Sequence, residues 1–155
     1  MGKRDRSKID QAVRAVREIS PRRQSGVLVI EDDPDLQWRL ARMLTVHGSR
    51  VVGTSTGDGA LALIAQWPVE LVLVDQDLPG MSGLEVARRI RQSHPGVQVV
   101  LMTGDDSEET LLAAKLAGAA ACLVKPFHVE ALWDLLLALA MQDSDVAVAI
   151  AEPAE

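Results

Sequence analysis

The chain has 155 residues, 48% of them hydrophobic and 25% charged, which suffices for one domain with a substantial core. Its apolar runs are far shorter than the roughly 20 residues of a membrane helix, and no apolar stretch follows the basic N-terminus as it would in a secretory signal. The single cysteine, Cys122, excludes an internal disulfide and suits a reducing compartment, so we expect a cytoplasmic protein.

The net charge of −6 is unevenly distributed along the chain. Residues 1–25 carry eight Lys/Arg and three Asp/Glu, whereas the remainder carries eight and nineteen, so the two parts have charges of +5 and −11. A basic, amphipathic segment of this kind can bind nucleic acid or an acidic partner, or it can be a solvated extension. We therefore expect an N-terminal extension over 1–25, a domain over 26–142 and a C-terminal tail over 143–155.

From Val27 onward, short apolar runs alternate with helical patterns. The run Val27–Ile30 predicts a buried parallel strand, and Asp33 and Pro34 predict the N-cap and first residue of the helix that follows it. In chain order we then predict a strand over 50–54, a helix over 58–65, a strand over 69–74, a helix from a capping box at Ser82 to about 93, a strand over 97–102, a helix from a capping box at Asp106 to Gly118, a strand over 120–124 and a helix over about 128–141.

Five strands that alternate with five helices predict an α/β fold with a doubly wound parallel sheet. Right-handed crossovers favour the flavodoxin-like strand order 2-1-3-4-5, with the five helices flanking the sheet. Ligands of such sheets bind beyond the carboxyl ends of the strands, so the residues at these ends are the candidates for function.

The predicted strand ends carry three acids, a hydroxyl and a lysine: Glu31 and Asp32, Asp75, Thr103 and Lys125. Taken alone, each has an ordinary explanation, such as a helix cap or a solvated turn residue. Together at one sheet edge they favour a site for Mg²⁺, because clustered carboxylates repel one another unless a hard cation joins them. Phosphoryl transfer fits this set: Asp75 is the nucleophile, and Lys125 and the Thr103 hydroxyl stabilise the phosphoryl oxygens.

The sequence resembles the response-regulator receiver family over about residues 26–141. The segments that carry the resemblance are Val27–Pro34, Leu73–Gly83, Val99–Gly104 and Gly118–Phe127. The resemblance implies a two-component protein that takes a phosphoryl group on Asp75 from a histidine kinase or histidine phosphotransfer protein and signals by protein–protein interaction. It is not expected to be an enzyme beyond its own phosphorylation and dephosphorylation.

The same resemblance implies the roles of individual residues. Asp32 is expected to hold Mg²⁺ directly and Glu31 mainly through water, and the backbone carbonyl of Asp77 completes the protein ligands. Thr103 corresponds to the switch hydroxyl and Lys125 to the conserved-type lysine of the family.

Some positions depart from the family pattern. Glu31 stands where many relatives have Asp. Cys122 occupies the switch position, where an aromatic residue is typical, so the output switch is expected to be weaker or different. The acids Asp77 and Asp105 flank the pocket, where they either alter the lifetime of the phosphoryl group or point to solvent.

Two surfaces are candidates for partners. The last helix is apolar around well over half its circumference, which favours a homodimer through it, or cover from residues 146–151 or the N-terminal segment. Trp38 lies nearly opposite the apolar stripe of the first helix, where it either anchors a phosphoryl donor or lies flat on its own helix. Direct DNA binding is not expected, since residues 1–25 are too few for a DNA-binding domain and no helix-turn-helix pattern follows the receiver.

Two other functions remain open. A pseudo-receiver would bind its partner without regard to phosphate, which Cys122 and the acidic neighbours permit. A Mg²⁺-dependent phosphatase of the haloacid-dehalogenase type is suggested by the acids at Asp75 and Asp77. In that family, however, the motif lies near the N-terminus and no acidic pair precedes it.

Overall fold

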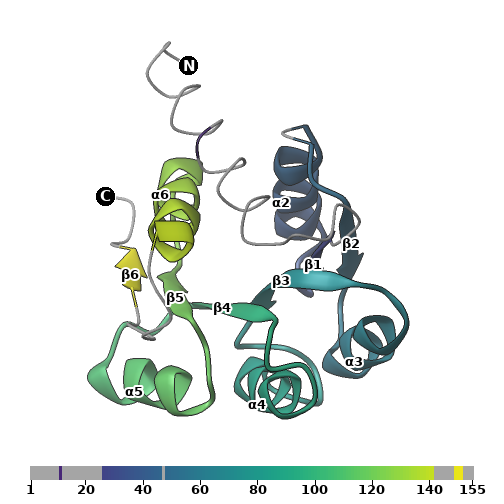
Figure 1. Ribbon diagram of the computed structural model, residues 1–155. Helices are drawn as coiled ribbons and strands as arrows, with labels where there is room; N and C mark the ends of the chain where they lie inside the picture. Colours follow the sequence, from purple (N-terminus) through teal and green to yellow (C-terminus); the bar gives the residue numbers. More distant parts are fainter. Residues whose placement is uncertain (1–10, 12–25, 47, 142–148, 152–155) are drawn as a thin grey trace.

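The structure is a computed structural model that describes residues 11, 26–46, 48–141 and 149–151. Element labels follow Figure 1. The strands are β1 (Gly26–Ile30), β2 (Val51–Thr54), β3 (Val69–Asp75), β4 (Gln98–Thr103), β5 (Ala121–Val124) and β6 (Ala149–Ala151). The helices are α2 (Pro34–Val46), α3 (Gly57–Gln66), α4 (Gly83–Ser93), α5 (Glu108–Leu116) and α6 (Val129–Met141).

The strands form one parallel sheet in the order β2-β1-β3-β4-β5-β6. The predicted order 2-1-3-4-5 is therefore confirmed, with a short sixth strand added beside β5. In the register of that last pair, Ala121 lies opposite Ala149 and Leu123 opposite Ala151. Ala149–Ala151 belongs to the predicted C-terminal tail, for which the sequence predicts no strand.

Helices cover both faces of the sheet, as Figure 1 shows: α2 and α6 on one face, and α3, α4 and α5 on the other. Side chains alternate along each strand. In β1, Val27 and Val29 therefore pack toward α2 and α6, whereas Leu28 and Ile30 pack toward α3 and α4. This two-sided burial explains why the strands are continuous apolar runs.

Predicted and observed element ends mostly agree within one residue. The two predicted capping boxes, however, differ from the observed contacts at the starts of α5 and α4. The N-cap of α5 is Ser107, whose hydroxyl accepts from Thr110 N, and not Asp106. Ser82 does cap α4, but the Glu85 carboxylate pairs with Arg88 and Arg89 instead of returning to the cap.

Several expectations fall partly or wholly outside the described residues. These are the basic, amphipathic segment over 1–25, the division of the chain at 25 and 142, and most of the tail. Within the described part, no helix combines the length and apolar character needed to cross a membrane.

Candidate functional site

Three predicted site residues form an acidic cluster, which we define as Glu31, Asp32 and Asp75. Each offers a carboxylate oxygen, and these oxygens all lie within 4.8 Å of one another. The strands explain the meeting: Glu31 follows β1 and Asp75 ends the neighbouring β3, at positions that continue the alternation toward α2 and α6. Glu31 and Asp75 are buried, whereas Asp32 is exposed.

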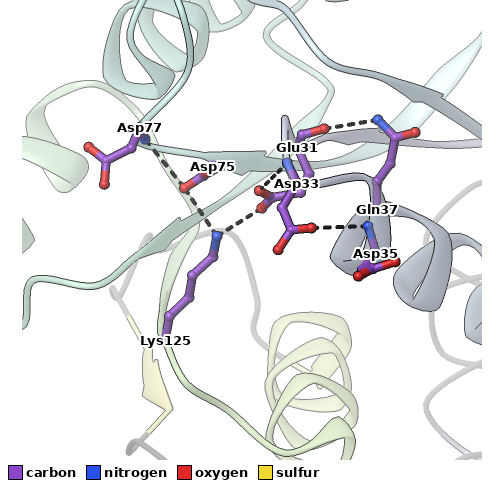
Figure 2. Close-up of polar contacts among 7 residues, drawn as sticks. All are labelled: Glu31, Asp33, Asp35, Gln37, Asp75, Asp77 and Lys125. Carbon is purple, nitrogen blue, oxygen red and sulfur yellow. Dashed lines mark hydrogen bonds and ion pairs between the residues drawn. The ribbon is translucent and has the colours of Figure 1, made fainter.

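Lys125 bridges the two buried members of the acidic cluster (Figure 2). Its Nζ donates to Glu31 Oε2 at 2.8 Å and lies 3.3 Å from Asp75 Oδ1. Lys125 follows β5 with the same alternation as Leu123, which packs toward α6. Residues 94 positions apart are therefore brought together by strand order and face alone.

Burial and ion pairing shift the pKa values of Glu31 and Lys125 in opposite directions. Burial raises the pKa of Glu31 above its ordinary value, although hydrogen bonds from Lys125 and from Asp33 N partly oppose it. Burial lowers the pKa of Lys125, but the hydrogen bond and charge of Glu31 and the charge of Asp75 outweigh it, so the lysine pKa is raised. The lysine is thus held as a cation, while for the Glu31 carboxylate the effect of burial outweighs that of its hydrogen bonds.

The backbone around Asp75 is fixed by the start of α4. Asp77 N donates to Asp75 Oδ1 at 3.3 Å, and Gly83 N donates to the carbonyl of Gln76 at 3.0 Å. A Cβ on Gly83 would overlap the Asp75 carbonyl and come within 2.7 Å of Gln76 Cα. Glycine is therefore required for this close approach, a role that the sequence pattern alone did not reveal.

Thr103 lies at the end of β4, one residue beyond Met102, which pairs with Asp75. Its side chain is buried, and its hydroxyl accepts from Asp105 N at 3.0 Å. The Asp105 carboxylate accepts from Ser107 N at 2.9 Å and from Thr110 Oγ1 at 2.8 Å. Asp105 therefore binds the N-cap residue and the first turn of α5, a contact that the sequence pattern does not indicate.

Comparison with known proteins identifies the family. The model of the response regulator receiver domain matches residues 27–137. The chain belongs to this family. It is 36% identical over 110 residues to the response regulator protein FleR of Pseudomonas aeruginosa and 38% identical over 104 residues to the transcriptional regulatory protein KdpE of Mycobacterium tuberculosis. These matches cover 71% and 67% of this chain but only 23% and 46% of the relatives, so the chain spans less than half of their length.

Solved structures confirm the receiver fold. The chemotaxis response regulator CheY4 of Vibrio cholerae is similar with a TM-score of 0.66 and 25% identity, over 74% of this chain and 94% of that one. The BeF3-activated receiver domain of DrrB has a TM-score of 0.69 and 27% identity, over 77% of this chain and 99% of that one.

Receiver domains generally bind Mg²⁺ at an acidic pocket, and the donor set found here suits that ion. The acidic cluster offers only carboxylate oxygens, which are the hard ligands that Mg²⁺ prefers. A divalent cation there would also reduce the repulsion among the three carboxylates.

Cys122, which the resemblance places at the switch position, lies in β5 and is fully buried. Its side chain packs in the core between the sheet and α3–α5, and burial raises its pKa to about 11. Cys122 is therefore a small apolar core residue and not a reactive thiolate.

Proposed function

We propose that Asp75 accepts a phosphoryl group in a magnesium-dependent reaction and that this change controls binding to another protein. The observation that carries the proposal is the bridge from Lys125 Nζ to Glu31 and Asp75, at 2.8 and 3.3 Å, inside the acidic cluster. An ordinary ion pair needs one carboxylate. A lysine shared by two buried carboxylates beside a third is suited to a ligand of several charged oxygens.

The chain's own groups account for the steps of the transfer. An Asp75 carboxylate oxygen attacks phosphorus in line, forming an O–P bond while the bond from phosphorus to the donor's imidazole nitrogen breaks. Lys125 would neutralise an equatorial oxygen, and its contact with Asp75 supports this role. The Thr103 hydroxyl accepts from Asp105 N, so its own hydrogen could be donated to a phosphoryl oxygen. Asp32, Asp75, the Asp77 carbonyl and, through water, Glu31 would hold Mg²⁺, which would supply further positive charge to the phosphoryl oxygens.

Receiver domains work with histidine kinases in two-component systems, and the family is not generally one of enzymes. We propose such a kinase, or a histidine phosphotransfer protein, as the donor. Trp38 on α2 is a candidate anchor for that donor: the residue is 60% exposed, and the Arg42 guanidinium lies 5.2 Å from the centroid of its ring. Trp38→Ala should slow transfer from the cognate donor if the ring is an anchor, and an unchanged rate would assign it to packing on its own helix.

The structure gives different support to Asp77 and to Asp105 as residues that alter the lifetime of the phosphoryl group. The Asp105 carboxylate is engaged with α5, so a direct effect on the attacking water is less well supported there. Asp77 is exposed beside Asp75, and its carboxylate is the better candidate for a group that sets phosphoryl lifetime. An unchanged dephosphorylation rate in Asp77→Asn would remove that idea.

Oligomerisation and DNA binding remain predictions. Leu132, Trp133, Leu135, Leu136 and Leu139 of α6 are already buried, so less of this helix is left for a second protomer than its composition suggested. Sedimentation of the free and phosphorylated chain tests the homodimer. Relatives such as KdpE are transcriptional regulators, and our expectation that this chain does not bind DNA directly is untested.

The alternative of a pseudo-receiver is tested with beryllofluoride, which mimics a phosphoryl group on a carboxylate. We expect Mg²⁺-dependent binding in the wild type, and in an Asp58→Asn control outside the site, but none in Asp75→Asn. Absence of binding in the wild type would favour the pseudo-receiver. Sustained turnover of an aryl phosphate would instead favour the haloacid-dehalogenase alternative.

A further inference from the structure

A glutamine of α2 contacts the backbone that carries the acidic cluster. The side chain of Gln37 is half-buried, and its Nε2 donates to the carbonyl oxygen of Glu31 at 2.9 Å (Figure 2). The N–H of Glu31 in turn donates to the carbonyl of Thr54 in β2 at 3.1 Å. Both backbone groups of Glu31 are thus restrained, one by the sheet and the other by Gln37.

The neighbouring strand accommodates Gln37 at a glycine. A Cβ on Gly53 of β2 would lie 3.0 Å from Cδ and Oε1 of Gln37 and 3.3 Å from its Cγ. Gly53 pairs with Val29 of β1, two residues before Glu31. The Gln37 amide therefore rests on the backbone of β2 while it bonds the end of β1, and it ties α2 to both strands.

The carbonyl that Gln37 holds belongs to the peptide unit joining Glu31 to Asp32. Because a peptide unit is planar, fixing the orientation of its carbonyl fixes the direction in which the chain enters Asp32. Asp32 is exposed, unlike the other members of the acidic cluster, so its carboxylate has little packing to hold it. The Gln37 bond restrains the peptide unit before Asp32, and a bond from Asp33 N to Glu31 Oε1 at 3.2 Å restrains the one after it.

We propose that Gln37 is a positioning residue for the divalent cation: it orients the peptide between Glu31 and Asp32 so that the acidic cluster meets the ion with its carboxylates in place. The inference rests on the proposed magnesium site and adds a residue whose side chain does not itself belong to the cluster. Groups that orient metal ligands from behind typically contribute about 10- to 100-fold to affinity. Since Gln37 acts through the backbone, we expect the lower end, about tenfold.

The test is the Mg²⁺ dissociation constant, measured by calorimetry on the full chain, together with the free energy of unfolding in metal-free buffer. Gln37→Met keeps the length of the side chain but removes the donor, so it should weaken Mg²⁺ binding about tenfold. Gly53→Ala keeps the glutamine but pushes its amide away, so it should weaken binding in the same direction. The double variant should bind no more weakly than Gln37→Met, since both changes break the same contact.

Two controls separate positioning from general stability. Gln92→Met changes an exposed glutamine of α4, and Gly96→Ala adds a Cβ in open space, so both should bind Mg²⁺ like the wild type. A Gln37→Met protein that is less stable but binds Mg²⁺ as tightly as the wild type would overturn the inference and leave the magnesium site intact. Failure of the wild type to bind Mg²⁺, or equal binding by Asp32→Asn, would overturn the proposed site and this inference with it.

Discussion

Without Mg²⁺, the Asp32→Asn variant should be more stable than the wild type. With Mg²⁺ present, it should be less stable than the wild type. Without a cation the acidic cluster holds three carboxylates against one lysine. Asp32 is the exposed member, and asparagine keeps its shape while removing its charge. The substitution therefore relieves repulsion, but it also removes a proposed ligand.

The magnitude follows from the geometry of the acidic cluster. Two unit charges 4.8 Å apart repel by about 0.9 kcal/mol in water and by about 3.5 kcal/mol at an effective dielectric constant of about 20. Because Asp32 is exposed, the lower value applies to its repulsion by Glu31 and to its repulsion by Asp75. Attraction between Asp32 and Lys125 offsets part of their sum. We expect Asp32→Asn to gain about 1 kcal/mol, or roughly 2–5 °C in melting temperature.

Magnesium should reverse that order. At about a hundredfold excess over its dissociation constant, Mg²⁺ stabilises a folded protein by about 2.7 kcal/mol, and a variant without a ligand gains much less. Urea denaturation of wild type and Asp32→Asn, with and without Mg²⁺, measures both signs. Asp58→Asn, in the first turn of α3, is the control and should lose a little stability in either buffer. The reasoning is refuted if Asp32→Asn is less stable than the wild type without metal, or if Mg²⁺ stabilises both equally.

Three further predictions concern the surroundings of the site. Gly83→Ala should lower the free energy of unfolding, measured in urea, by about 1–3 kcal/mol because its Cβ would overlap fixed backbone. Gly96→Ala, whose Cβ lies in open space, should leave it nearly unchanged. Equal effects of the two substitutions would contradict the close packing of α4 against Asp75. Cys122 should resist a thiol reagent in the native protein and react after unfolding, since it is buried with a pKa of about 11; rapid native labelling would contradict this. Hydrogen bonds, first from Ser107 N and then from Thr110, lower the pKa of Asp105, so the stability it contributes is present above its ordinary pKa of 3.8 and is lost as pH falls through the lowered value. Thr110→Val should raise that pKa in a carboxyl NMR titration, and an unchanged value would contradict the contact.

Much of the fold follows from the sequence because β1, β3, β4 and β5 are largely buried on both faces and appear as continuous apolar runs. The edge strand β2 is only partly buried. The strand β6 could not be predicted in this way. Ala149–Ala151 is only three residues long, two of them are alanines, which are depleted in strands, and it pairs with the edge of β5. The N-cap of α5 was placed one residue too early because Asp106 and Ser107 are both good caps and only their contacts distinguish them.

The candidate site was predictable to the extent that parallel strands deliver their end residues to one edge. That rule placed Glu31, Asp32, Asp75 and Lys125 together, and the structure brings these four into one group. It placed Thr103 at the same edge but could not show that its hydroxyl contacts Asp105 N.

The supporting residues were not predictable because their roles depend on tertiary contacts. Gln37 reads as an ordinary polar residue of a helix, and nothing in the sequence indicates that its amide reaches the end of β1 past Gly53. Gly83 lies in a recognisable motif, but its need for close approach to Asp75 follows only from the packing of α4.

The central claim, phosphorylation of Asp75, is tested most directly by intact-protein and peptide mass spectrometry after incubation with acetyl phosphate and Mg²⁺. We predict one phosphoryl group per chain, located on the peptide that contains Asp75. It should be absent in Asp75→Asn and in metal-free buffer. No labelling of the wild type, or labelling that persists in Asp75→Asn, would contradict the account.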